Sequence, residues 1–363
     1  MMKHESKLLA LTIGDPTGIG PEITVKALQR LNEFPDLSLT VIGSAAALEK
    51  AARDLELPLP QDGLVPPPLR GKLGEGEGNS PNLALDGAPP PLTLPSRGGE
   101  SHRSSENVVS RIRYHPIEAD LPGAVAYHAI DQAVRMIAEG KAEALVTGPI
   151  SKRNLAAAGY AYPGHTEILE TLARKYFNAP NAAAEMLFVH KKFRLLLLTR
   201  HVALKDVPAA LAAPGAIARP LKTLIGFLRN RLKISEPRIA LLGVNPHAGE
   251  IGGEEENNLY APVMKAVNAI GNTRLEGPFP ADAFFRGFDA RNNDYDAVVA
   301  AYHDQGLIPF KILAGFEAVN VTIGLPFLRT SVGHGTADDI VGKGLADESS
   351  LIAALRAAAD MVE

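Results

Sequence analysis

Near its start the chain reads Leu8-Leu9-Ala10-Leu11-Thr12-Ile13-Gly14-Asp15-Pro16-Thr17-Gly18-Ile19-Gly20-Pro21-Glu22. A mostly apolar run enters a turn rich in Gly and Pro, and a helical pattern follows from residue 22 to about residue 31. Such a run predicts a buried strand, so the segment predicts a strand, a loop and a helix. The loop resembles a phosphate cradle. It lacks the spacing of G-x-G-x-x-G and of the Walker A motif, so a rigid structural turn is equally open.

The same unit recurs along the chain. Apolar runs at residues 39–43, 144–147, 239–243 and 297–300 each lead into Gly, Pro or His, and helical patterns lie between them. Short apolar strands that alternate with helices predict an α/β fold with a mainly parallel core sheet. Ligands of such sheets lie beyond the carboxyl ends of the strands, and the unusual polar clusters of this chain fall at such ends.

Bulk properties narrow the class of protein. A length of 363 residues predicts two domains or one large two-lobed unit. The net charge of −4 gives no broad positive surface, so we expect neither nucleic acid nor a membrane as a partner. The absence of cysteine excludes disulfides, thiolate metal ligands and a cysteine nucleophile. With no apolar signal core and no run of about 18 apolar residues, we expect a cytoplasmic protein.

One segment breaks the pattern. Residues 60–110 are rich in Pro, Gly and Ser and show little periodicity. A structureless loop of this length is uncommon inside a compact domain. We therefore interpret it as a flexible surface insertion without a catalytic role.

Three of the ten histidines lie just after predicted strands: His201, His247 and His303. Neutral imidazole binds zinc and several other divalent ions, and three histidines leave coordination positions open for water or substrate. Asp304 and Glu250, which lie close to two of them in sequence, are candidates to orient the rings. Spacings of 46 and 56 residues form no motif, so hydrogen-bonded structural histidines remain the alternative.

Two further segments suggest anion binding. In Pro163-Gly164-His165-Thr166-Glu167, which precedes a helical pattern, Thr166 either caps the helix or joins His165 in donating hydrogen bonds to an anion at the helix N-terminus. Lys311 and Arg329 sit among apolar residues, and a buried cation needs an anionic partner. That partner is either a carboxylate of the protein or a ligand phosphate or carboxylate, which Asn320 would also contact.

Taken together, the segments resemble the 4-hydroxythreonine-4-phosphate dehydrogenases, the PdxA family of vitamin B6 biosynthesis. The matching pieces follow family order and cover nearly the whole chain except about residues 60–110. They are the 14–22 loop, Thr147-Gly148-Pro149, Gly164-His165-Thr166-Glu167, His201, Asn245-Pro246-His247-Ala248-Gly249-Glu250, Gly277-Pro278-Phe279-Pro280-Ala281-Asp282, Tyr302-His303-Asp304-Gln305-Gly306 and residues 320–344. Ser151 departs from the pattern, because some relatives have His there.

The resemblance implies a fold like that of isocitrate and isopropylmalate dehydrogenases, an α/β/α architecture with two lobes around a cleft and no Rossmann domain. Residues 1–363 would then form one two-lobed unit, and two chains would form a homodimer that shares the active site at its interface. It also implies roles for particular residues. The metal ligands would be His201, His247 and His303, the substrate-binding residues His165, Thr166, Lys311, Asn320 and Arg329, and the NAD(P)-binding residues Gly335, Thr336 and Asp339 of the glycine-rich 334–344 loop.

The implied reaction is the metal-dependent oxidation of 4-phosphohydroxy-L-threonine by NAD or NADP, followed by decarboxylation to 3-amino-2-oxopropyl phosphate. The metal would be Zn, Mg or Co, one per subunit. Asp304 and Lys205 are the candidates for the general acid and base. Two alternatives stay open: a dehydrogenase of D-threonate or D-erythronate 4-phosphate or of a cis-dihydrodiol, and, more remotely, a three-histidine metallohydrolase.

Overall fold

The computed structural model describes residues 6–60 and 111–362, so all but one residue of the expected 60–110 insertion lies outside the described residues. The strands are β1 (Lys7–Thr12), β2 (Leu37–Gly43), β3 (Ile112–Pro116), β4 (Ala144–Thr147), β5 (Glu185–His190), β6 (Phe193–Leu197), β7 (Arg238–Leu242), β8 (Arg274–Phe279), β9 (Ala297–Ala300), β10 (Val319–Ile323) and β11 (Leu328–Ser331). The α-helices are α1 (Gly20–Leu28), α2 (Ala45–Asp54), α4 (Pro122–Ala138), α5 (Lys152–Ala157), α6 (His165–Phe177), α7 (Val207–Ala212), α8 (Ala218–Asn230), α9 (Ala261–Ala269), α10 (Ala281–Phe285), α11 (His303–Ala314) and α12 (Ser349–Met361). Single turns η1 (Leu31–Glu33), η2 (Leu204–Asp206), η3 (Pro246–Gly249), η4 (Glu256–Tyr260) and η5 (Gly315–Glu317) complete the set.

Most of the predicted elements are confirmed. The strands expected at 144–147 and 297–300 are β4 and β9, and the first strand is followed by a loop and a helix as predicted. That helix, α1, begins two residues earlier than expected, with Pro21 in its first turn, where a missing N–H costs nothing. It also ends earlier, at Leu28, and the single turn η1 follows.

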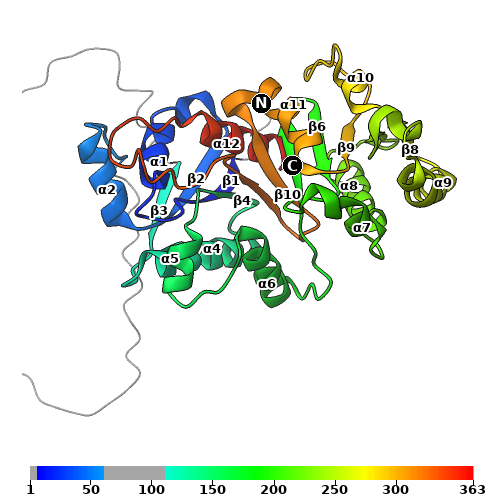
Figure 1. Cartoon of the computed structure of the whole chain (residues 1–363). Helices are drawn as coiled ribbons and strands as arrows, with labels where there is room; N and C mark the ends of the chain where they lie inside the picture. Colours follow the sequence, from blue (N-terminus) through cyan, green and yellow to red (C-terminus); the bar gives the residue numbers. More distant parts are fainter. Residues whose placement is uncertain (1–5, 61–110, 363) are drawn as a thin grey trace, which may run out of the picture.

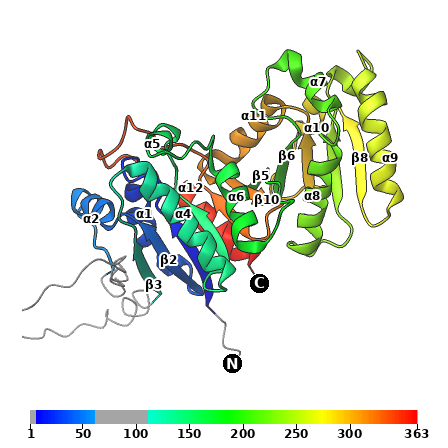
Figure 2. The same ribbon diagram turned by 90° about the horizontal axis from the view of Figure 1, so that it is seen from below.

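Within the described residues, the strands form one sheet of eleven in the order β3-β2-β1-β4-β11-β10-β5-β6-β9-β7-β8. The strands from β3 to β11 are parallel to one another, and so are β6, β9, β7 and β8. Between the two groups, the pairs β11–β10, β10–β5 and β5–β6 are antiparallel. The predicted parallel sheet therefore reverses direction at its centre, and the carboxyl ends of the two groups point to opposite edges. Figures 1 and 2 show one group with α1, α2 and α4 at one end of the molecule and the other with α8 and α9 at the opposite end.

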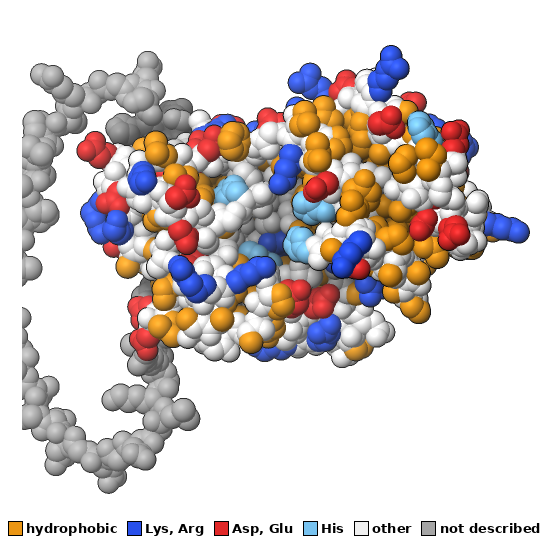
Figure 3. All heavy atoms as spheres, viewed as in Figure 1, with side chains coloured by type: hydrophobic (Ala, Val, Ile, Leu, Met, Phe, Trp, Pro, Cys, Tyr) orange, Lys and Arg blue, Asp and Glu red, His pale blue; other side chains and the backbone are white. Residues whose placement is uncertain are grey.

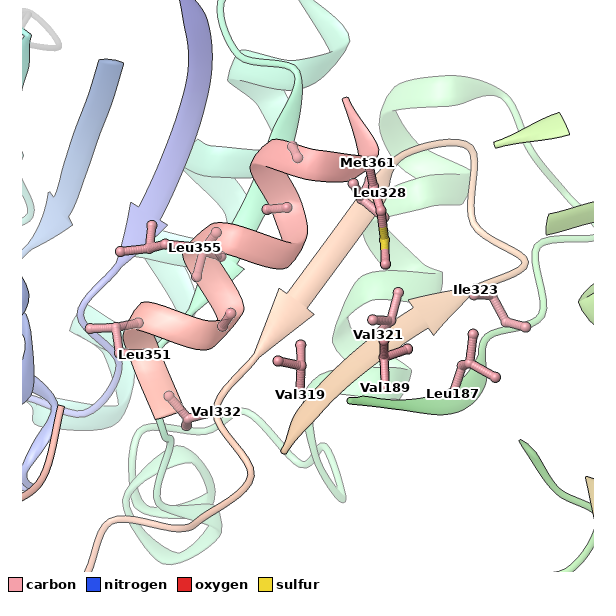
Figure 4. Packing of buried hydrophobic residues seen from close by; sticks show 14 of the residues in the cluster. Leu187, Val189, Val319, Val321, Ile323, Leu328, Val332, Leu351, Leu355 and Met361 are labelled. Atoms are coloured by element: carbon pink, nitrogen blue, oxygen red, sulfur yellow. The ribbon is translucent and has the colours of Figure 1, made fainter. Parts of the chain in front are cut away.

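The two faces of this sheet are covered differently. On one face a single buried cluster runs through both groups of strands and takes in α1, α8 and α12; Figure 4 shows its centre, where α12 packs over β10, β11 and β5. On the other face the buried residues divide into two separate clusters. One lies under α4 and α6, and the other lies under α11. The predicted α/β fold with helices on both faces is confirmed, and this second face has a gap over the antiparallel centre.

No helix among the described residues is long and apolar enough to cross a membrane. The cytoplasmic location expected from the sequence stays a prediction.

Candidate functional site

A pocket of about 690 Å³ lies over the centre of the sheet on the face where the core is divided. Strand register explains its floor. Asn320 of β10 pairs with Phe188 of β5 and with Ser331 of β11, and Thr322 of β10 pairs with Arg329 of β11. Directly paired residues point to the same face, so all five side chains share one surface. The walls are residues that follow β4, β6 and β11 and those around the start of α6. Figure 3 shows histidine and basic side chains around the hollow on this side of the molecule.

Arg329 is the main charge of the pocket floor. Its side chain is 4% exposed, and its hydrogen bonds go only to hydroxyls: Nε and Nη2 donate to Thr147 Oγ1, and Nη1 donates to Thr322 Oγ1 at 3.0 Å. No carboxylate of the described residues pairs with it. Burial lowers the pKa of Arg329 to about 9. The anionic partner expected from the sequence is therefore not found among the described residues, in which two of the five guanidinium N–H groups have no partner.

The start of α6 faces the same pocket. Its N-cap residue is Gly164, with no side-chain cap, so the interpretation of Thr166 as the helix cap is wrong. The N–H groups of this first turn are left for another acceptor, as at helix N-termini that bind anions. His165 and Thr166 both line the pocket. Burial and the neighbouring charge of Arg329 hold the pKa of His165 well below its usual value, so its ring is neutral at pH 7.

Three buried polar atoms of the pocket residues have no hydrogen-bond partner in the part of the chain that the structure describes. They are Nε2 of His165, Oδ1 of Asn320 and Nε2 of His334. A buried polar atom without a partner costs free energy, and such atoms are rare in folded proteins. Their gathering around one buried arginine indicates a binding site for a polar, negatively charged ligand.

The 14–20 loop packs closely against neighbouring backbone. A Cβ on Gly14 would lie 2.1 Å from the carbonyl oxygen of Pro149, and one on Gly20 would lie 1.9 Å from that of Ile13. Gly14 is therefore required where the loop packs against the end of β4, and Gly20 where it packs against the end of β1. The loop is held further by the buried carboxylate of Asp15, which accepts hydrogen bonds from Thr17. The pocket does not include it.

The 334–344 loop, expected to bind the cofactor, packs on this turn. The N–H of Ile19 donates to the carbonyl oxygen of Thr336 at 3.1 Å, and Figure 1 shows the loop (red) extending beside α1 and α2. Gly335 lines the pocket, Thr336 lies against Gly18, and Asp339 is exposed. The loop therefore joins the pocket to the surface above α1, and the cofactor roles of its residues stay predictions.

The three histidines follow β6, β7 and β9, which are parallel neighbours, so their strands bring them to one edge of the sheet. The ring centroids of His201 and His303 are 5.9 Å apart. His303 Nδ1 lies 2.7 Å from Asp304 Oδ1, and the role of Asp304 in orienting this ring stays a prediction. Glu250 is exposed and has no such contact in the described chain. Among the described residues of one chain, no three His, Asp or Glu side chains converge as a metal site.

The remaining candidates lie outside the pocket of a single chain. Lys311 is exposed on α11, so the inference that it is a buried cation is wrong. Its sequence neighbour Phe310 is fully buried, and the two point in different directions because successive helix residues are rotated by about 100°. Lys205 is exposed in the turn η2. Ser151, which departs from the family pattern, is the N-cap of α5.

Several supporting residues were not identified from the sequence. Thr147 and Thr322 bind Arg329, while Gln305 and Glu256 bind the backbone of the histidine loops. Both threonines lie in segments that match the family, at Thr147-Gly148-Pro149 and in residues 320–344, but nothing in the sequence pairs them with Arg329. Gln305 lies inside the His303 motif, which was the available signal.

Comparison with known proteins shows which family the chain resembles. The family model described as "Pyridoxal phosphate biosynthetic protein PdxA" matches residues 96–358. A 4-hydroxythreonine-4-phosphate dehydrogenase of Bradyrhizobium diazoefficiens is 38% identical over 99% of both chains. A D-threonate 4-phosphate dehydrogenase of Cupriavidus necator is 37% identical over 98% of this chain and 97% of its own.

Solved structures give the same picture. The 4-hydroxythreonine-4-phosphate dehydrogenase of Klebsiella pneumoniae superposes with a TM-score of 0.73 at 32% identity over 97% of each chain. A terephthalate 1,2-cis-dihydrodiol dehydrogenase of Burkholderia xenovorans has a TM-score of 0.57 at 26% identity over 98% of each chain.

Proposed function

The chain belongs to the PdxA family of pyridoxal phosphate biosynthetic proteins, and from this premise we propose that it oxidises 4-phosphohydroxy-L-threonine with NAD or NADP. Loss of CO₂ from the oxidised product would then give 3-amino-2-oxopropyl phosphate. Relatives with the corresponding name match this chain over nearly its full length, and relatives of this kind are dehydrogenases, which use a nicotinamide cofactor. The two groups of strands would act as two lobes with the pocket between them.

The observation that carries the proposal is the buried guanidinium of Arg329. It has hydroxyl partners only, and it lies in a pocket with the uncapped start of α6. A phosphate group matches both, because its oxygens accept from a guanidinium and from helix N–H groups. Neutral His165 and Asn320 would contact the same end of the substrate and set its orientation.

Two of the three predicted metal ligands, His201 and His303, lie close enough together to fit part of a divalent metal site. His201 and His303 lie with their rings near one another, and Asp304 would orient His303 as metal-bound imidazoles usually are oriented. We propose that His247 completes this set, with Zn, Mg or Co as the ion. A bound ion would lower the pKa of the substrate hydroxyl and stabilise the negative charge that develops as CO₂ leaves. Asp304 or Lys205 would then move the proton, and Gly335, Thr336 and Asp339 would hold the cofactor.

The substrate has rivals within the same class. The relative from Cupriavidus necator is named for D-threonate 4-phosphate, and a solved structure is named for a cis-dihydrodiol. The buried Arg329 favours an anionic substrate, with a phosphate or a carboxylate, over a neutral diol. A three-histidine metallohydrolase remains the more distant alternative.

Absorbance at 340 nm tests the proposal directly. The purified chain is incubated with added Mg²⁺, Zn²⁺ or Co²⁺, with NAD⁺ or NADP⁺, and with one candidate substrate at a time. We expect reduction of the cofactor with 4-phosphohydroxy-L-threonine at a kcat/KM at least about tenfold above that with D-threonate 4-phosphate, D-erythronate 4-phosphate or a cis-dihydrodiol. The reverse order would reassign the substrate. Metal-dependent phosphate release without cofactor reduction would favour the hydrolase.

We further propose that the working unit is a homodimer with its site at the subunit interface. One face of α11 and the following turn is apolar and exposed: Ile308 is 57% exposed, Ile312 78% and Phe316 69%, at a spacing of four residues. Apolar side chains gather beside the hollow where Figure 1 places α11. Lys311 lies beside this apolar face. If a second copy of the chain packs there, the Lys311 side chain of the first copy would lie close to the surface of the second.

Ile312→Glu tests the dimer. A carboxylate in the centre of an apolar interface is costly to bury, so we expect the mass measured by light scattering to halve and the kcat to fall more than tenfold. Ile270→Glu is the matched control, because Ile270 is also 78% exposed but lies at the end of α9. A parent chain that is monomeric yet fully active would contradict the shared site.

A further inference from the structure

The three histidine loops are hydrogen-bonded to one another at the edge of the sheet. The loop that carries His201 begins with Thr199, whose backbone N–H and hydroxyl both donate to the carbonyl oxygen of Ala301. Ala301 precedes His303 by two residues, and its N–H donates to Gln305 Oε1 at 2.8 Å. Gln305 Nε2 then donates to the carbonyl oxygen of Gly243 at 2.6 Å, at the start of the loop that carries His247. One amide side chain thus joins two of the loops, and Thr199 ties the third to them.

The His247 loop is held from its other side by Glu256. This side chain is 5% exposed, and Oε1 accepts the N–H groups of Val244 and Asn245 at 2.8 and 2.9 Å. Its Oε2 accepts from Asn245 Nδ2 at 3.0 Å. Glu256 opens the π-turn η4, a helix geometry that recurs at functional sites.

The backbone of this loop is unusual. His247 and Ala248 both have positive φ, at 56° and 54°, which residues with a Cβ rarely adopt. A Cβ on Gly243 would lie 2.7 Å from the Cα of Ala248, so the turn is tightly packed. Such a conformation persists only where surrounding contacts fix it, and it is most common at functional sites. The contacts of Glu256 with the two residues before Pro246 fix the entry to this turn.

We propose that Glu256 and Gln305 are positioning residues that hold the His201, His247 and His303 loops in the arrangement from which the proposed homodimer binds a divalent metal at its shared site. The inference rests on the proposed function, because it takes these histidines as the ligands. Neither side chain need touch the metal: Glu256 acts through the backbone before His247, and Gln305 acts through Ala301 and Gly243. Without Glu256 and Gln305, the contact of Thr199 with Ala301 would still join two of the loops, but the His247 loop would lose its hydrogen bonds to Glu256 and Gln305. The loss of hydrogen bonds that orient metal ligands weakens metal affinity by about 10–100-fold.

Titration with Co²⁺ after removal of bound metal by a chelator tests the proposal, with visible absorption as the readout. Glu256→Gln keeps the shape but replaces one acceptor oxygen with an N–H donor, which must face either the N–H groups of Val244 and Asn245 or the donating Nδ2 of Asn245. We therefore expect the Kd for Co²⁺ to rise at least tenfold. Saturating Co²⁺ should bring the kcat back to within about threefold of the parent. Glu254→Gln is the matched control, since Glu254 is an exposed carboxylate two residues earlier, and its Kd should stay unchanged.

Gln305→Glu is the second variant, and it decides the question where Glu256→Gln does not fold. It replaces the Nε2 donor with an oxygen that faces the carbonyl oxygen of Gly243, so this hydrogen bond is lost. We expect the Kd for Co²⁺ to rise at least tenfold here too. A Kd within twofold of the parent in the folded variants, even with a lower Tm, refutes the positioning role. His247→Ala separates this failure from that of the proposed function. If His247→Ala binds Co²⁺ as tightly as the parent, the ligand set is wrong and both proposals fail.

Discussion

Replacing His247 with Ala is expected to abolish metal-dependent cofactor reduction while the fold is retained. A metal that stabilises developing charge supplies several kcal/mol, so its loss should lower kcat/KM by at least about 10³-fold. His247 is exposed on the turn η3 and contributes nothing to the buried clusters. The change in stability should therefore stay within about 0.5 kcal/mol, a shift in Tm of about 1–2 °C.

The measurement combines absorbance at 340 nm, thermal unfolding and metal analysis of the purified variant. His115→Gln is the control, because His115 lies in β3 at the far end of the sheet from β6, β7 and β9. It should keep the parent's kcat/KM and metal content. Unchanged turnover in His247→Ala would remove this residue from the metal site, whatever the behaviour of the other two histidines.

The strands were predictable because each is a short apolar run ended by Gly or Pro. In β1, Leu9 and Leu11 enter one buried cluster and Ala10 the other, so the run is buried on both faces and reads as continuously apolar. The reversal at the centre of the sheet was not predictable. The antiparallel pairing of β10 with β5 joins residues more than 120 apart in the chain, and no local pattern encodes it.

The site was partly predictable because some of its polar residues lie within apolar strands. Arg329 and Asn320 lie on strands whose apolar neighbours make a polar side chain conspicuous, and both line the pocket. Lys311 was misjudged because apolar neighbours along a helix do not share a direction. Glu256 and Gln305 were missed because their partners lie about 11 and 62 residues away, and only the folded chain brings them together.

Replacing Arg329 with Met is expected to raise the KM for the phosphorylated substrate at least about 100-fold without loss of stability. A hydrogen-bonded charge pair with phosphate contributes roughly 1.5–3 kcal/mol, and more in a buried site. Thermal unfolding with inorganic phosphate gives a second readout: phosphate should raise the Tm of the parent but not that of the variant. Arg194→Met is the matched control, because Arg194 is a largely buried arginine outside this pocket, and it should leave the KM unchanged.

The charge of Arg329 also predicts a pH dependence. Burial lowers its pKa well below the ordinary arginine value, to about 9, so the free enzyme loses this charge as the pH rises through about 9. The kcat/KM of the parent should then fall above pH 9, and the decline should be absent from Arg329→Met, whose kcat/KM is already low.

The contribution of Arg329 to the free energy of unfolding changes with pH in the opposite direction to its contribution to kcat/KM. Above pH 9 the folded chain has lost this proton while the arginine of the unfolded chain keeps it, so the contribution of Arg329 to stability increases with pH there. At pH 7 the buried charge is a cost of order 5 kcal/mol. The lost hydrogen bonds to Thr147 and Thr322 offset part of the gain from its removal. The Tm of Arg329→Met at pH 7 should therefore be no lower than that of the parent. A Tm several degrees lower with an unchanged KM would instead make Arg329 a structural residue, and the phosphate site would have to lie elsewhere.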